Sequence, residues 1–284
     1  MSAATATASE TLTDLGSLRD FSYPPWKISV RKNHILKSNC SMPNLCPRGD
    51  EGGGDDKKLC TFCRYNTSLN LPSYPEMLFA DNLLRIEHEL GFGIEFQPLD
   101  ALLLVNDKQD LIKVAVAKAW KEARANSEHI TDVVKPFDWT FTTNYKGNLI
   151  GKNGKLEVSP TEQRIDLEKL KQTEKILFYD EIHLFEDELA DHGASSCTIK
   201  IRVMPSGFFV LHRFYLRVDD VLIRINDTRL HYELGNDHLL REYSSRESFI
   251  EDLRVPSSMF LNPNEIWTHL TLKEESIEKL RFPT

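Results

Sequence analysis

The sequence predicts an α+β fold, a single domain built on antiparallel β-sheets with flanking helices. Three observations support this. From Lys175 to Ile225, alternating apolar and polar residues are separated by short turn signals, as in antiparallel strands with one buried face. Residues 110–125 instead carry apolar side chains at helical spacing. No internal repeat or central linker divides the 284 residues, which favours one domain.

The N-terminal part predicts little regular structure. Residues 1–20 are rich in Ala, Ser and Thr without a sustained apolar period, which is typical of a disordered tail. A half-buried strand is expected from Trp26 to about Leu36. Residues 39–70 contain Pro, three consecutive Gly and clustered Asp, which predicts an inserted loop outside the core. The folded domain is therefore expected over 21–284, interrupted by this loop.

The middle of the chain predicts a strand pair and helices. Leu83–Glu89 and Gly93–Phe96 flank a Gly-Phe-Gly turn and are expected to pair. The clearest helix covers Asp110–Ala125, because its apolar residues share one face. Shorter elements are expected as strands at 139–143 and 155–158 and as a helix at 166–173.

The strongest strand signals come later. Thr198–Val203 alternates, Phe208–Val218 is largely apolar and aromatic, and Val221–Ile225 follows a tight turn. The polar residues Asn226–Arg229 then follow an apolar strand, where they either cap a turn or contact a ligand. Both interpretations stay open. The last forty residues predict short helices.

Composition and charge exclude several classes of function. There are 35 basic and 43 acidic residues, a net charge of −8, which opposes non-specific binding to nucleic acid or anionic lipid. No apolar run is long enough to span a membrane. Without a signal or transit peptide, we expect the cytosol or nucleus, where thiols stay reduced. The G-x-S-x-G, H-E-x-x-H, P-loop and G-x-G-x-x-G motifs are all absent, which favours a protein-binding regulator over an enzyme.

Four cysteines form the sharpest local pattern. Cys60 and Cys63 have the C-x-x-C spacing that lets two thiolates hold one zinc ion. Cys40 and Cys46 would complete a Cys₄ set, but their five-residue gap is wider than usual. Free thiols in the inserted loop are therefore favoured, with a structural zinc, and a zinc-dependent adaptor, as the alternative. Cys197 is expected in the core.

An acidic run raises a second alternative. Glu186, Asp187, Asp191 and His192 lie close together in the sequence and could hold a divalent cation or act as general acid and base. The chain would then be a metal-dependent hydrolase using residues 186–192. A solvated strand end or a protein contact is the interpretation that we favour, because linear acidic runs usually face solvent.

Ten blocks of sequence, in order, resemble one family. They are PPWK (24–27), LPSYPEMLF (71–79), GFGIEF (91–96), KPFDWT (135–140), YKG (145–147), LFEDEL (184–189), DHG (191–193), KIRVMP (200–205), LIRINDTR (222–229) and LREYSSRE (240–247). From Phe21 to Pro283 the chain thus resembles the TOR signalling pathway regulator-like (TIPRL) family, which regulates type 2A protein phosphatases.

The resemblance implies a non-enzymatic regulator that acts in TOR and stress signalling, and the localisation expected from the N-terminus is the cytoplasm and also the nucleus. It implies that the chain binds catalytic subunits of type 2A, 4 and 6 phosphatases, including their C-terminal tail. We expect the chain alone to be a monomer without cofactor. Positions associated with phosphatase binding map to Asp100, Ile165, Ile225 and Asp227. Ile225 replaces the family's usual Met, and a contact should survive because both side chains are apolar and similar in volume.

Three arginines on or beside the late strands suit the capture of a carboxylate. They are Arg202, Arg224 and Arg229. They could equally pair across the sheet with Glu186, Asp187 or Glu188, and the sequence leaves both arrangements open.

Overall fold

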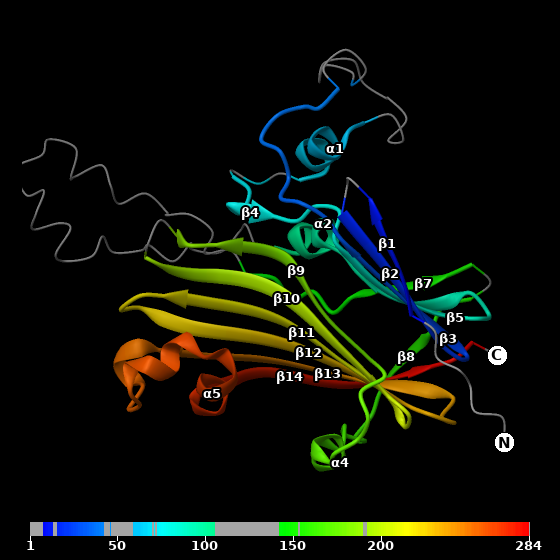
Figure 1. Cartoon of the computed structure of the whole chain (residues 1–284). Coiled ribbons are helices and arrows are strands. Elements are labelled where there is room, and N and C mark those ends of the chain that lie inside the picture. The colour runs from blue at the N-terminus through cyan, green and yellow to red at the C-terminus, as the bar shows by residue number, and fades with distance from the viewer. Residues whose placement is uncertain are drawn as a thin grey trace, which may run out of the picture.

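The computed structural model places two β-sheets face to face (Figure 1). The structure describes residues 8–13, 16–42, 46, 59–69, 71, 73–105, 142–152, 154–189 and 192–283. All strand pairs in both sheets are antiparallel. This confirms the predicted α+β class with antiparallel sheets.

The first sheet has six strands in the order β1-β2-β3-β5-β6-β7. Their bounds are β1 Ala8–Thr13, β2 Gly16–Tyr23, β3 Trp26–Lys32, β5 Leu83–His88, β6 Phe92–Phe96 and β7 Asn148–Gly151. The predicted strand pair around the Gly-Phe-Gly turn is β5 and β6, with Ile86 opposite Ile94.

The second sheet has eight strands in the order β4-β9-β10-β11-β12-β13-β14-β8. Their bounds are β4 Met77–Leu78, β8 Glu157–Pro160, β9 Phe178–Asp187, β10 Gly193–Met204, β11 Gly207–Val218, β12 Leu222–Glu233, β13 His238–Phe249 and β14 Thr271–Arg281. Strands β9 to β14 pair in chain order, because most of their connections are short turns.

Short helices complete the described part of the chain. They are α1 Thr61–Ser68, α2 Pro98–Leu103, α4 Leu167–Lys171, η4 Ile250–Asp252, η5 Ser257–Leu261, α5 Pro263–Ile266 and η6 Trp267–His269. None of the described helices is long and apolar enough to cross a membrane. The helix predicted over Asp110–Ala125, and most of the strand predicted at 139–143, lie outside the described residues.

One hydrophobic core lies between the sheets. Trp26 of β3 makes edge contacts with Phe208 of β11 and Tyr232 of β12, at centroid distances of 5.6 and 5.4 Å. Ile28 and Ile86 from the first sheet, like Phe208, have no exposed surface and belong to the same buried cluster. Alternating strand positions therefore face a shared core, which makes the two sheets one folding unit.

Two predictions for the N-terminal part are wrong. Residues 1–20 do not form a disordered tail throughout, because Ala8–Thr13 and Gly16–Tyr23 are paired strands and Phe21 is 2% exposed. Residues 39–70 are not wholly outside the core either. Helix α1 places Tyr65 in the core with no exposed surface, and its hydroxyl donates to the Ala80 carbonyl at 2.8 Å.

Two predictions for the C-terminal part also need correction. Asn226–Arg229 does not cap a turn, because β12 continues through these residues to Glu233. Within the last forty residues, the short helices extend only from Ile250, after the end of β13, to His269, and β14 then adds an 11-residue strand. Thr271–Arg281 alternates weakly in polarity, since most of its side chains face solvent.

Candidate functional site

The outer face of the eight-stranded sheet, which points away from the first sheet, carries basic side chains from neighbouring strands. Arg202 of β10 is paired with Phe209 of β11, and Leu211 and Arg213 of β11 are paired with Arg229 and Asp227 of β12. Since alternate residues point to one face, Arg202, Arg213 and Arg229 lie on the same side.

These arginines line a hollow of about 470 Å³. Its walls combine cations with apolar surface from Leu167 and Leu170 of α4 and from Trp267 of η6. A smaller hollow of about 200 Å³ shares Leu167, Arg229 and Trp267 with the first. We call the two together the arginine groove, and its guanidinium groups are those of Arg164, Arg202, Arg213, Arg229 and Arg246.

The buried carboxylate of Asp227 holds an arginine at the centre of the arginine groove. Its side chain has no exposed surface, and its two carboxylate oxygens accept hydrogen bonds from Arg213 Nε and Nη2, both at 2.7 Å. Arg229 Nη2 lies 3.7 Å from Asp227 Oδ2. A buried carboxylate held in this bidentate manner fixes the direction of its arginine, so Asp227 positions Arg213 while its own side chain stays covered from solvent.

The other cations of the groove are held mainly by an aromatic ring and by carbonyl groups. The guanidinium carbons of Arg229 and Arg246 lie 4.6 and 4.1 Å from the Trp267 ring centroid. Arg202 Nη2 donates to the Leu170 carbonyl at 2.7 Å, and Arg246 Nη1 donates to the Leu270 carbonyl at 2.9 Å. Among the described residues, neither Arg202 nor Arg246 has a carboxylate within 4.0 Å.

Acidic side chains border the smaller hollow. Arg164 forms an ion pair with Glu275 and lowers the pKa of that carboxyl, mainly through a hydrogen bond. Glu242 accepts from the backbone N–H of Ile165 at 2.7 Å. Arg202 in the larger hollow and Arg246 in the smaller one are therefore the guanidinium groups of the groove without a carboxylate partner among the described residues.

The predicted partner-binding residues fall into three groups. Arg202, Arg229 and Ile165 line the groove, while Asp227 and Ile225 lie buried beneath or beside it. Ile225 has no exposed surface and packs in a small cluster with Ile266 and Leu270, so it supports the helices next to the groove.

Arg224 and Asp100 lie elsewhere. Arg224 points to the opposite face of the sheet and pairs with Glu247. The half-buried Asp100 on α2 accepts hydrogen bonds from Gln97 and Asn148. Neither residue reaches the arginine groove. Arg202 contacts the Leu170 carbonyl, Arg224 pairs with Glu247, and Arg229 lies near Asp227. These partners differ from the alternative cross-sheet pairs with Glu186, Asp187 or Glu188.

Sequence reasoning missed Arg213, Arg246, Trp267 and Arg164. The position of Arg213 could have been inferred from strand alternation. It lies two positions after Leu211 and therefore on the same face of the strand. Trp267 lay in a predicted helical region without periodicity, and only the return of the chain over the sheet brings it to Arg229.

The acidic run does not form a metal site among the described residues. Glu186 bonds the ring of His183, and the buried Asp187 accepts from the backbone N–H groups of Glu76 and Leu189 at 3.1 and 2.8 Å. Asp191 lies outside the described residues. These contacts are those of a carboxylate that secures a chain turn.

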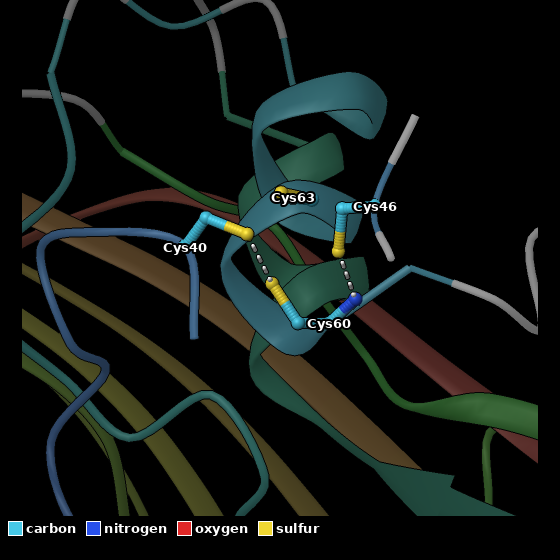
Figure 2. A group of neighbouring side chains, drawn as sticks. All are labelled: Cys40, Cys46, Cys60 and Cys63. Atoms are coloured by element: carbon cyan, nitrogen blue, oxygen red, sulfur yellow. Dashed lines mark hydrogen bonds between the residues drawn. The ribbon is translucent and has the colours of Figure 1, made fainter. Parts of the chain in front are cut away.

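The four predicted cysteine ligands do come together. The sulfur atoms of Cys40, Cys46, Cys60 and Cys63 all lie within 4.8 Å of one another (Figure 2). Cys197 stands apart with no exposed surface, in the core as predicted.

Comparison with known proteins places the chain in a family. The family model described as the TIP41-like family matches residues 77–254. A TIP41-like protein of Homo sapiens is 52% identical over 268 residues, covering 94% of this chain and 91% of the relative. A TIP41-like protein of Caenorhabditis elegans is 40% identical over 253 residues, with 87% and 84% covered.

A fungal relative also matches most of the chain. The type 2A phosphatase activator tip41 of Schizosaccharomyces pombe is 31% identical over 272 residues, covering 93% of this chain and 98% of the relative. These matches confirm the resemblance carried by the ten sequence blocks. The chain, with its paired antiparallel sheets and arginine groove, belongs to the TIP41-like family.

Proposed function

We propose that this chain is a non-enzymatic regulator of type 2A family serine/threonine phosphatases. In this proposal it binds the catalytic subunits of the type 2A, 4 and 6 enzymes as a monomer in the cytoplasm and nucleus, within TOR and stress signalling. Relatives named as type 2A phosphatase activators, in Schizosaccharomyces pombe and Saccharomyces cerevisiae, support a phosphatase partner. The groove supports a way of binding it.

The observation that carries the proposal is the unneutralised charge of the arginine groove. The protein as a whole is acidic, with a net charge of −8, so an acidic partner is repelled at long range. Arg202 and Arg246 nevertheless lack carboxylate partners in the described part of the chain. A flexible tail that ends in a free carboxylate offers a charged acceptor, whereas within the described residues these guanidinium groups bond only to backbone carbonyls.

The apolar lining would hold the side chains that precede that carboxylate. Leu167, Leu170, Phe209 and Trp267 line the same hollow. Charge and apolar surface side by side select an extended peptide over a small inorganic anion, because the peptide buries both kinds of surface. Ile165 extends this lining into the smaller hollow.

Calorimetry with a synthetic peptide of the phosphatase C-terminal tail tests the proposal. The free-acid peptide should bind, and amidation of its terminus should weaken binding by roughly tenfold or more, since a charge-assisted hydrogen bond contributes about 1.5–3 kcal/mol. Arg229→Glu should weaken binding more than Arg229→Ala, because reversal adds repulsion. Added salt should weaken binding moderately.

Arg31→Glu supplies the matched control. Arg31 is exposed on β3 of the first sheet, so its reversal changes net charge equally but leaves the groove intact. If amidated and free-acid peptides bind equally, or if Arg31→Glu weakens binding as much as Arg229→Glu does, the groove is not the tail site.

A further inference from the structure

We propose that Cys40, Cys46, Cys60 and Cys63 bind one structural Zn²⁺ ion, which clamps helix α1 to the segment that follows strand β3. This inference is independent of phosphatase binding. It rests on the convergence of four thiols from two pairs of cysteines, Cys40 with Cys46 and Cys60 with Cys63, that are separated by 14 positions in the sequence.

The spacing of the sulfur atoms fits tetrahedral zinc. With Zn–S bonds of about 2.3 Å, the sulfurs of a ZnS₄ centre lie about 3.8 Å apart. In the structure, Cys40 Sγ and Cys60 Sγ are 3.6 Å apart, and all four sulfurs are within 4.8 Å of one another. All five cysteines are free thiols, so four donors converge on a point without forming disulfides.

The local backbone supports thiolate ligands. Cys60 caps helix α1 and Cys63 lies in its first turn, which points both sulfurs to the same side. The backbone N–H of Cys60 donates to Cys46 Sγ at 3.3 Å (Figure 2). The backbone N–H of Met42 donates to Cys40 Sγ at 3.4 Å. N–H donors toward sulfur stabilise negative charge, and such outer contacts orient metal ligands.

The four cysteines of this cluster are buried or half-buried, unlike thiols that are fully exposed on a protein surface. Cys46 and Cys60 are 7% and 6% exposed, while Cys40 and Cys63 are half-buried. Four thiols with S₄ geometry select zinc or an iron–sulfur cluster. Zinc binding releases the thiol protons to solvent as the sulfurs become thiolates, and no redox step is needed.

The clamp would have a clear structural purpose. Helix α1 has eight residues and no side-chain cap, and an isolated helix of this length is unstable in water. It nevertheless carries Tyr65, which is fully buried in the core. Arg64 adds a long ion pair of 3.8 Å to Asp81 and lies 5.8 Å from the Tyr65 ring centroid. A metal that ties Cys60 and Cys63 to Cys40 and Cys46 would hold this helix in place.

Metal analysis of the full chain, purified without a metal-binding tag, tests the site. Elemental analysis should find one zinc per chain, and cobalt substitution should give the visible absorption of tetrahedral cobalt–thiolate. A chelator should lower the melting temperature by several degrees. Thiol titration of the folded protein should detect four additional reactive thiols after chelation, leaving buried Cys197 unreactive until the chain unfolds.

Two variants complete the test. Cys60→Ser/Cys63→Ser should lose the zinc, whereas Cys197→Ala should keep one zinc per chain, since Cys197 lies apart in the core. If the double variant does not fold, the metal content and the thiol count of the native chain still test whether the four cysteines bind zinc. Stoichiometric iron, a Cys40–Cys60 disulfide, or four reactive thiols in protein incubated with excess zinc would each overturn the zinc assignment.

Discussion

The two faces of the eight-stranded sheet use the same strands for opposite purposes. On the inner face, Phe208 and Phe214 of β11 have no exposed surface and lie in the continuous core between the sheets. On the outer face, Phe209 and Arg213 of the same strand line a groove. Neighbouring residues of one strand therefore lie in a packed interior and on a charged surface, because successive side chains point to opposite faces.

The outer face nevertheless contains buried charge. Asp227 is as inaccessible as the inner phenylalanines, yet its burial depends on two hydrogen bonds from Arg213. Burial on the inner face rests on the hydrophobic effect, whereas burial on the outer face requires a matched partner. The faces should therefore respond differently to substitution.

The largest effect is expected on the inner face. Phe208→Ala should lower the free energy of unfolding by about 3–5 kcal/mol, because it removes an aromatic ring that contacts Trp26 and leaves a cavity. Phe209→Ala, one position along and half-buried, should cost less than about half as much. Urea unfolding of both variants measures the difference. Equal losses would mean that the outer face is packed as tightly as the inner one.

Breaking the buried ion pair on the outer face should come next. Asp227→Ala leaves Arg213 without its carboxylate and should cost about 3 kcal/mol. The double variant Arg213→Met/Asp227→Leu should recover much of that loss, since it removes both members of the buried pair while Arg229, 3.7 Å from Asp227, keeps its contact with the Trp267 ring. Asp219→Asn serves as control, because Asp219 pairs with Arg217 at 2.7 Å but is half exposed, and should cost under about 1 kcal/mol. Additive losses in the double variant would contradict this account.

A smaller effect should appear as pH dependence on the inner face. His212 is 1% exposed, lies 3.1 Å from the Cys197 sulfur, and stacks on Phe96. Burial lowers the pKa of His212 to about 4, although the nearby Asp227 charge opposes the shift. The unfolded chain therefore binds more protons than the folded chain between about pH 6.5 and pH 4, and stability falls as pH is lowered through that range.

This titration should cost about 2 kcal/mol between pH 7 and pH 5. His212→Gln removes the group, so the difference in stability between native protein and variant should shrink by that amount over the same range. Urea unfolding at several pH values gives the comparison. Parallel pH profiles for the two proteins would show that His212 does not titrate in this way.

The smallest effect concerns binding at the groove. Arg202→Ala should weaken binding of the free-acid tail peptide about tenfold, or about 1.4 kcal/mol, while changing stability by less than about 1 kcal/mol. Arg217→Ala is the control, because Arg217 also lies on the outer side of the sheet but pairs with Asp219 outside the groove. A matching loss in both variants would point to general electrostatics.

Much of the central sheet could be predicted from the sequence, because strand alternation is a local property. Thr198–Val203 and Phe208–Val218 lie within β10 and β11, and the Gly-Phe-Gly turn joins β5 to β6. Prediction was weaker where side chains alone do not specify pairing. Leu18 is the only large apolar side chain among residues 16–20, yet these residues form a strand because β3 offers an edge for backbone hydrogen bonds.

For the candidate sites, the sequence by itself determined which chemical groups are present, and the tertiary structure decided which of them meet. The C-x-x-C spacing predicted two candidate zinc ligands, but only the tertiary structure shows that Cys40 and Cys46 lie beside them. Arg202 and Arg229 were recognisable, whereas Trp267 and Arg213 complete the groove through cross-strand register and a helix folded over the sheet. Asp227 became a buried positioning residue for the same reason, since side-chain partners from distant strands are fixed by three-dimensional packing and not by local pattern.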